Sequence, residues 1–206
     1  MSAPRVLILG IGNLLWADEG FGVRTVEHLH AHYRFPPNVQ LLDGGTQGIY
    51  LVQHVEEADI LLVFDAIDYG LEPGTLKLVE DNDVPSFMGA KKMSLHQTGF
   101  QEVLAMAQLL GRYPKHLLLV GVQPVELDDF GGSLRSAVKA QIGPAIQAAL
   151  DWLGKLGVHA TPRTEPLLTG QSGHSALHIH DYEANRPTES DACRIGDERF
   201  LARLAG

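Results

Sequence analysis

Four short runs of almost purely apolar residues recur along the chain, and they constrain its fold more than any other feature. Continuous rather than alternating hydrophobicity predicts strands that are buried on both faces, as in parallel sheets. Helical patterns lie between the runs, so strands and helices alternate. This alternation predicts a three-layer, doubly wound α/β fold, in which a mostly parallel, twisted sheet is flanked by helices. The runs are 5–10, 39–44, 59–66 and 116–122.

Three segments carry apolar residues at helical spacing, and a fourth predicts one further strand. Ser94 and Gln97 form a capping box at the start of the second helix. Gly143 and Pro144 predict a kink or a split in the third helix. A turn followed by an extra strand is expected within 71–80. The three helical segments are 20–33, 94–110 and 133–156. The buried stripe of the second consists of Phe100, Val103, Leu104 and Ala107.

The chain has 206 residues, which is enough for one α/β domain with a substantial core and some surplus. After about residue 163 the hydrophobic periodicity stops, and Gly, Ser, Thr and Pro become frequent. We therefore divide the chain into an α/β domain over 1–161, which would carry any catalysis, and a C-terminal extension over 162–206. The extension is expected to be mostly irregular, with a short helix near 194–204.

Charge and cysteine content exclude several classes of protein. The formal net charge of −9 disfavours a nucleic-acid partner or an anionic membrane. The single cysteine excludes a disulfide framework within the chain and fits a reducing cytoplasm. The apolar N-terminal segment contains glycines and is followed by acids, which favours a buried strand over a signal peptide. No apolar stretch approaches the roughly 20 residues that span a bilayer, so no membrane insertion is expected.

The stretch "GIGNLLWADEG", from Gly10 to Gly20, combines glycines with adjacent acids. Gly10 and Gly12 match the start of a dinucleotide-binding fingerprint, but Leu15 occupies its third glycine position. Asp18 and Glu19 stand where a pyrophosphate would need free backbone N–H groups. The loop therefore suits a cation better than an anion, although Asp18 also fits the role of a helix cap. A nucleotide-dependent oxidoreductase of Rossmann type remains the least favoured alternative.

Acidic side chains follow or end three of the predicted strands. Ligands of doubly wound sheets bind beyond the carboxyl ends of the strands, so Glu19, Asp43 and Asp65 are expected at one edge. Asp65 ends an apolar strand, where a charge is costly unless it is paired, capping or metal-bound. His96 lies in the first turn of a predicted helix, whose dipole favours the neutral imidazole that a metal requires. Glu19, Asp65 and His96 form an O,O,N set that suits a borderline divalent ion.

Other polar clusters are interpreted as incidental. His28 and His32 have a zinc-compatible spacing, but no H-E-x-x-H pattern accompanies them, which favours a solvated histidine face. The cluster "HSALHIHDYE" lies in the irregular extension and lacks preorganised geometry. "GQSGH" only approximates a G-x-S-x-G nucleophile motif and does not follow a strand. Asp68 is expected to be a turn residue.

Six segments, in matching order, resemble those of the hydrogenase maturation proteases, which trim the C-terminal extension from the large-subunit precursor of nickel–iron hydrogenases. The resemblance covers about residues 4–160, and its combination of motifs is specific. The segments are "ILGIGNLLWADEGFGVR" (8–24), "LLDGGTQG" (41–48), "VFDAIDYG" (63–70), "PGTL" (73–76), "SLHQTG" (94–99) and "LVGVQP" (119–124).

The resemblance implies a phosphorylase/hydrolase-like three-layer fold and a metal-binding trio at Glu19, Asp65 and His96. It implies that the ion is nickel, supplied by the already metallated precursor, with no tightly held ion of the protease's own. Three weak ligands at an open edge would hold a free ion poorly, yet they could complete the coordination of an ion bound in the precursor. The long tail resembles that of an extended subgroup associated with uptake hydrogenases, and the resemblance assigns it no function.

Two mechanisms of hydrolysis stay open. In the favoured one, the metal polarises the scissile carbonyl or activates water. In the other, nickel only positions the precursor, and a carboxylate, Glu19 or Asp43, acts as general base in the manner of an aspartyl protease. Asp43 and the loop Gly44-Gly45-Thr46 are expected to contact the tail of the precursor, unless Asp43 is only a strand-end turn residue. A non-catalytic nickel-sensing chaperone is the alternative function.

Overall fold

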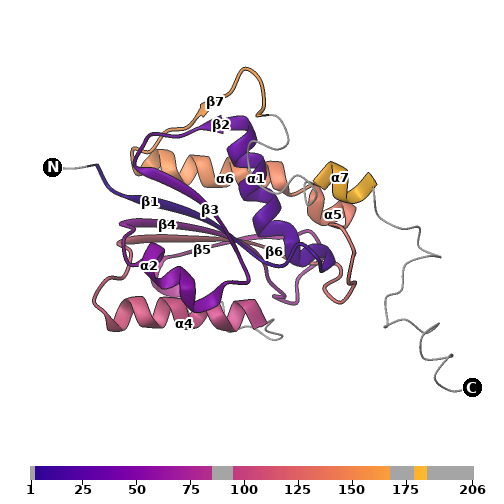
Figure 1. Ribbon diagram of the computed structural model, residues 1–206, viewed down its shortest axis with the longest axis horizontal. Coiled ribbons are helices and arrows are strands. Elements are labelled where there is room, and N and C mark those ends of the chain that lie inside the picture. Colours follow the sequence, from indigo (N-terminus) through magenta and orange to yellow (C-terminus); the bar gives the residue numbers. More distant parts are fainter. Residues whose placement is uncertain (1–2, 85–94, 168–178, 185–206) are drawn as a thin grey trace, which may run out of the picture.

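The computed structural model describes residues 3–84, 95–167 and 179–184, of which 82, 95–98, 180 and 181 are described by their backbone only. Its main sheet has the strand order β3-β1-β4-β6-β5, and all neighbours are parallel except β5 and β6. This arrangement confirms the predicted doubly wound, mostly parallel sheet (Figure 1). The strands are β1 (Val6–Ile11), β3 (Val39–Gly45), β4 (Ile60–Ala66), β5 (Leu76–Glu80) and β6 (His116–Val122).

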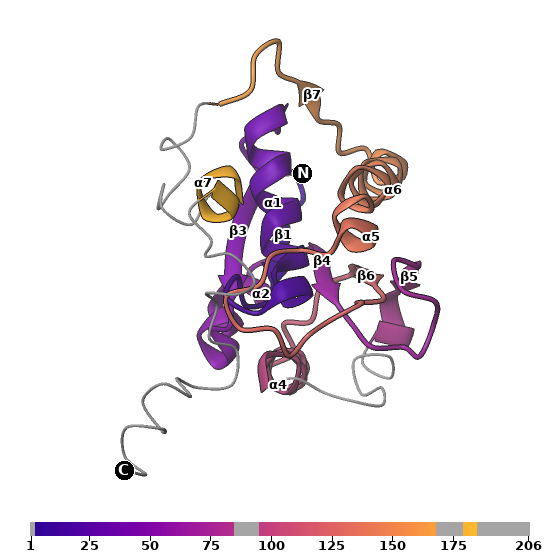
Figure 2. The same ribbon diagram turned by 90° about the vertical axis from the view of Figure 1, so that its right-hand side faces the viewer.

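Helices cover both faces of the sheet and complete the three predicted layers (Figure 2). One face packs against α1 (Phe21–His32) and α6 (Ile142–Lys155), and the other against α2 (Val52–Val55) and α4 (Leu95–Leu109). The predicted stripe of α4 is buried as expected: Phe100, Val103, Leu104 and Ala107. The remaining elements are η1 (Ala17–Gly20), η2 (Gly48–Leu51), η3 (Asp81–Asp83), α5 (Ser136–Lys139) and α7 (Ile179–Ala184), with a two-stranded sheet of β2 (Tyr33–Arg34) and β7 (Thr161–Pro162).

Two predictions about individual elements are wrong in detail. β3 is an edge strand, so Gln40 and Asp43 are exposed and the strand is not buried on both faces. The third helical segment does split, but it does so between α5 and α6, before Gly143 and Pro144. Pro144 lies in the first turn of α6, where its missing N–H removes no helical hydrogen bond.

The described part of the C-terminal extension contains two elements that the sequence analysis does not predict. β7 pairs with β2 at the start of the extension, and helix α7 follows further on. The helix expected near 194–204 and the cap Ser94 both lie outside the described residues. Within the described part of the chain, no helix is both long enough and apolar enough to cross a membrane.

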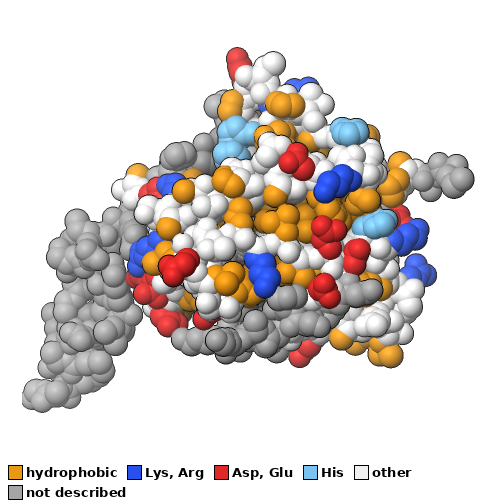
Figure 3. Space-filling view, turned by 180° about the vertical axis from the view of Figure 1, so that it is seen from behind, with side chains coloured by type: hydrophobic (Ala, Val, Ile, Leu, Met, Phe, Trp, Pro, Cys, Tyr) orange, Lys and Arg blue, Asp and Glu red, His pale blue; other side chains and the backbone are white. Residues whose placement is uncertain are grey.

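The second edge of the sheet is β5, which runs antiparallel to its neighbour. Leu78 on this strand is 45% exposed, and Leu71 just before it is 41% exposed. Seen from behind, hydrophobic side chains gather across the middle of the molecule, and acidic and basic side chains are mixed around them (Figure 3). No broad basic region is visible among the described residues of this face, in line with the acidic net charge.

Glycines let α1 approach the sheet with its backbone. A Cβ atom on Gly22 would collide with the carbonyl oxygens of Phe64 and Ile11, and one on Gly10 would collide with the carbonyl of Gly22. Gly12 has a φ of 133°, and a Cβ there would collide with the carbonyl of Glu19. The glycines that match a nucleotide fingerprint are therefore used for close helix–strand packing.

Gly22→Ala is expected to lower the free energy of unfolding by about 3 kcal/mol or more, because backbone atoms on both sides cannot yield to the added methyl group. Urea unfolding followed by circular dichroism measures the change. Gly143→Ala is the matched control, since nothing lies within 4 Å of a Cβ at Gly143 in helix α6. The control should stabilise the protein by up to about 1 kcal/mol. Equal effects of the two substitutions would contradict the packing role of Gly22.

Candidate functional site

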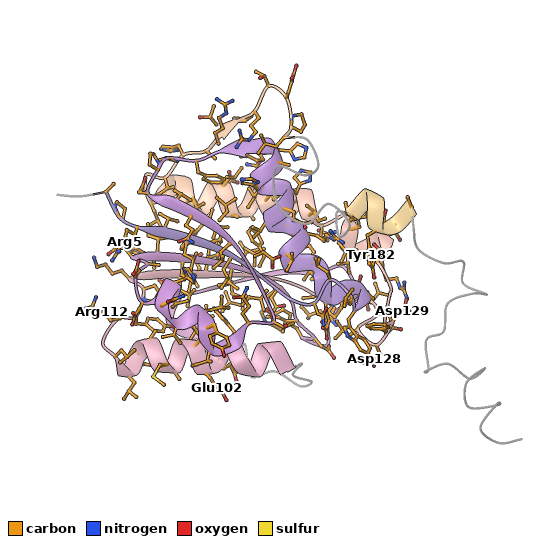
Figure 4. All side chains as sticks on the ribbon, viewed as in Figure 1. Arg5, Glu102, Arg112, Asp128, Asp129 and Tyr182 are labelled. Atoms are coloured by element: carbon orange, nitrogen blue, oxygen red, sulfur yellow. The ribbon has the colours of Figure 1, made fainter. Side chains whose placement is uncertain are left out.

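The acidic residues singled out in the sequence lie at the carboxyl edge of the sheet. Asp43 and Asp65 lie near the carboxyl ends of β3 and β4, and Glu19 lies in η1, in the loop that follows β1. The short helix η1 contacts strand β4, so the Glu19 backbone lies near the end of β4. Arg5 and Arg112 lie at the opposite end of the molecule from Asp128 and Asp129 (Figure 4). Glu19, Asp43 and Asp65 therefore share the carboxyl edge of the sheet.

The side chain of Asp65 faces the layer that contains α4. Alternate residues of β4, Leu61 and Val63, pack in the cluster under α4, and Asp65 continues this alternation. Its side chain is fully buried, and its Oδ1 accepts a hydrogen bond of 2.8 Å from the Ala66 N–H. A buried carboxylate is costly unless it is paired or binds a ligand, which makes Asp65 a candidate functional acid.

Helix α4 begins at this same edge, because it runs back along the sheet to the start of β6. Gly48 and Gly99 let the backbones of η2 and α4 approach, since a Cβ on Gly99 would lie 3.2 Å from the Gly48 Cα. His96 is in the first turn of α4, on the face of the sheet toward which Asp65 points. Its side chain is outside the described part of the structure. Among the described side chains, which exclude that of His96, no three His, Cys, Asp or Glu residues form a group able to hold a metal ion.

Asp18 and Glu19 are adjacent in sequence but differ in surroundings. Asp18 is fully buried, and its carboxylate accepts hydrogen bonds from the backbone N–H groups of Val125, Glu126 and Arg135 at 2.8, 2.9 and 2.7 Å. It makes no cap to its own helix, so the interpretation of Asp18 as a helix cap is wrong. Asp18 instead anchors the segment between β6 and α5. Glu19 is half-buried.

Gln123 organises the turn after β4, and nothing in the sequence analysis pointed to this role. Its Oε1 accepts hydrogen bonds from the backbone N–H groups of Tyr69 and Leu71 at 2.8 and 3.1 Å. Its Nε2 donates to Asp68 Oδ1 at 3.0 Å, and that oxygen also accepts from Gly70 N–H. Asp68 is thus the turn residue that the sequence predicts. The only signal for Gln123 was its place in the segment "LVGVQP".

Tyr69 is a second residue that sequence reasoning missed. Asp65 pairs in register with Gly121, and the Tyr69 hydroxyl occupies the space that a side chain on Gly121 would fill. Lys77 Nζ lies 5.1 Å from the centre of the Tyr69 ring. Burial, together with the negative charge of Asp65, raises the pKa of the Tyr69 hydroxyl far above its usual value. The phenol therefore stays protonated beside the end of β4.

Asp43 is exposed but lies close to a buried cation. Partial removal from water raises the pKa of the Asp43 carboxyl, while the Gly45 N–H and the charge of Arg24 oppose that rise. Arg24 is 5% exposed and makes an ion pair of 2.9 Å with Glu27. In the loop that follows, Gly44 is buried, Gly45 adopts a φ of 46° and Thr46 is exposed. Part of this loop is therefore exposed at the carboxyl edge of the sheet.

Of the clusters interpreted as incidental, only the His28–His32 pair is described with its side chains. The rings of His28 and His32 stack with centroids 3.9 Å apart, and His32 Nδ1 lies 2.9 Å from the carbonyl of His28. Burial and the neighbouring His32 lower the pKa of His28. The "GQSGH" stretch and His174 and His178 fall outside the described residues, and of His180 only the backbone is described.

Comparisons with known proteins point to one family. The family model described as hydrogenase maturation protease matches residues 23–152. The chain is 63% identical to hydrogenase expression/formation protein HupD of Thiocapsa roseopersicina over 205 residues, which is 99% of this chain and 93% of that protein. It is 64% identical to protein HupM of Azotobacter chroococcum, covering 98% and 96% of the two chains. The solved structure of the hydrogenase maturating endopeptidase HybD from E. coli superposes with a TM-score of 0.74 at 41% identity, over 78% of this chain and 98% of that one.

Proposed function

Because this chain belongs to the hydrogenase maturation protease family, we propose that it is the endopeptidase that removes the C-terminal extension from the large-subunit precursor of a nickel–iron hydrogenase. The observation that carries the proposal is the buried Asp65 carboxylate at the carboxyl edge of the sheet, on the face covered by α4. We place the reaction in the cytoplasm, in line with the single cysteine.

The nickel of the metallated precursor is the feature that the protease recognises. Glu19, Asp65 and His96 are the residues that would complete its coordination. Two carboxylates and one imidazole suit a borderline divalent ion, and the backbones that carry them come from η1, β4 and the first turn of α4. A set of three such ligands at an open edge favours an ion that is already held by the precursor over a free one. Nickel is accordingly part of the substrate.

Hydrolysis needs a polarised peptide carbonyl and an activated water. Nickel acting as Lewis acid would supply the first. On the side of the chain, Asp43 is a suitable general base, because its raised pKa makes it a stronger proton acceptor than an ordinary aspartate. In the loop next to it, Gly44 is buried, Gly45 is half-buried and Thr46 is exposed, and the loop would contact the extended tail of the precursor. We favour metal-assisted hydrolysis over the purely carboxylate-led route.

The same residues would serve a nickel-sensing chaperone that binds the precursor without cutting it. The oxidoreductase alternative loses its basis, because the chain belongs to the hydrogenase maturation protease family. Cleavage is therefore the property that separates the two functions that remain.

Incubation with nickel-loaded and nickel-free large-subunit precursor tests the proposal. We expect the precursor to shorten at its C-terminus only when nickel is present, because nickel completes the recognition site. Electrophoresis and mass spectrometry of both products measure the cut. Binding of the loaded precursor without any cut would support the chaperone, and equal cleavage of both forms would contradict recognition through nickel.

A further inference from the structure

The C-terminal extension returns to the carboxyl edge through helix α7 (Figure 2). Glu183 Oε1 accepts hydrogen bonds from Ser133 Oγ at 2.8 Å and from Lys139 Nζ at 2.9 Å. Its second oxygen accepts from the same ammonium group at 2.9 Å. Ile179, at the start of the helix, packs against the core cluster beneath α1 and α6. Helix α7 is therefore attached by both apolar and charged contacts.

The segment that Glu183 holds, residues 123–139, is also fixed from its inner side. The buried Asp18 carboxylate accepts three of its backbone N–H groups, as described above. Gly131 N–H donates to the Leu15 carbonyl at 2.7 Å, and the rings of Trp16 and Phe130 meet edge to face at 5.3 Å. Because β4 lies between β1 and β6, a segment that leads from the end of β6 to the loop after β1 passes the end of β4, where Asp65 lies. We call residues 123–139 the wall segment, because they run beside the edge at which Asp65 lies.

A second contact of α7 reaches the other side of the edge. The Arg24 guanidinium lies 5.7 Å from the centre of the Tyr182 ring, a distance typical of a cation–π contact. Arg24 is the buried cation whose charge acts on Asp43. Tyr182 and Glu183 are neighbours in α7. Tyr182 thus contacts Arg24, and Glu183 contacts the wall segment.

We propose that α7 is a clamp for the wall segment 123–139 and that Glu183 is its positioning residue. The proposal rests on the proposed proteolytic function and gives the C-terminal extension a part in it. When Glu183 holds Ser133 and Lys139, the wall is ordered before the precursor arrives. Without that carboxylate, the precursor must order the wall on binding, and the cost appears in KM rather than in kcat. The HybD endopeptidase is covered almost completely by 78% of this chain, whereas HupD matches along 99% of it, so a clamp of this kind would distinguish the longer relatives.

Glu183→Gln tests the proposal, because it removes the charge and keeps the shape. We expect KM for the nickel-loaded precursor to rise about three- to fivefold and kcat to stay within about twofold, because a partly exposed ion pair contributes modestly. Glu165→Gln is the matched control, since Glu165 is an exposed glutamate of the same extension. The double variant Lys139→Glu with Glu183→Lys exchanges the two charges of the pair. It should bring KM most of the way back to the wild-type value.

Hydrogen exchange of the intact protein gives a readout that does not depend on cleavage. In Glu183→Gln, the amides of Val125, Glu126 and Arg135 should exchange about three- to fivefold faster, while those of β1 and β4 keep their rates. Unchanged exchange, or a fall in kcat with KM unaltered, would overturn the clamp. If the wild-type protein cuts no precursor while the exchange still rises in the variant, the clamp stands and the proposed function fails.

Discussion

Asp65→Asn is expected to reduce cleavage of the nickel-loaded precursor by at least about a hundredfold, because even residues that only support metal ligands contribute roughly 10- to 100-fold. The amide keeps an oxygen for the Ala66 N–H and fills the same buried volume, so the fold should persist. Glu19→Gln and His96→Ala are expected to abolish processing in the same way. The C-terminal shortening of the precursor is followed by electrophoresis, and circular dichroism checks the fold.

Asp59→Asn is a suitable control for these variants. Asp59 precedes β4 at the amino edge of the sheet, where it pairs with Lys115 at 2.9 Å, so the substitution removes the same charge far from the candidate site. The control should cut the precursor at the wild-type rate. Full activity in Glu19→Gln, Asp65→Asn or His96→Ala would remove that residue from the proposed site.

Asp18→Asn is expected to lower the free energy of unfolding by about 2–4 kcal/mol, because the buried carboxylate accepts three backbone hydrogen bonds and the amide replaces only part of them. A helix cap alone would account for about 0.5–2 kcal/mol. Urea unfolding measures the loss, and exchange of the Val125 and Arg135 amides locates it in the segment between β6 and α5.

The neighbouring Glu19→Gln provides the contrast. Since Glu19 is only half-buried, its substitution should change the free energy of unfolding by no more than about 0.5 kcal/mol, while it removes the activity. Asp18→Asn should instead lose stability and keep its kcat at temperatures where the variant is folded, and any loss of activity should appear in KM, because Asp18 holds the segment between β6 and α5. If both substitutions changed stability alike, the separate roles of these adjacent acids would be wrong.

The sheet could be predicted from sequence because its signal is local. An apolar run such as 116–122 identifies β6 without knowledge of its neighbours. The edge position of β3 could not be predicted from its sequence, because its apolar run resembles those of the central strands. Its exposure depends on the order of the strands in the sheet. The split between α5 and α6 was misplaced because Pro144 is tolerated in a first turn, where it ends no helix. Helix α7 was missed because tertiary contacts, not periodicity, hold it.

In the candidate site, too, residues that follow a local rule could be selected from sequence, and residues defined by distant contacts could not. Glu19, Asp65 and His96 were selected by the rule that ligands lie beyond the carboxyl ends of parallel strands, and by the family resemblance. Asp18 was misread because its partners are 107 to 117 residues further along the chain. Gln123 was overlooked because its partner Tyr69 is 54 residues away. Residues whose role consists of distant contacts leave no local pattern.

The backbone contact at Gly22 also limits which parts of the molecule can adapt to precursors of different shape. Glu19 and Arg24 lie a few residues before and after Gly22, where the helix touches two strands directly. Because main-chain atoms meet there without intervening side chains, no rotamer change can let the helix shift. Accommodation of a bulkier precursor must therefore come from other parts of the edge, such as the segment between β6 and α5, where hydrogen bonds can break and re-form.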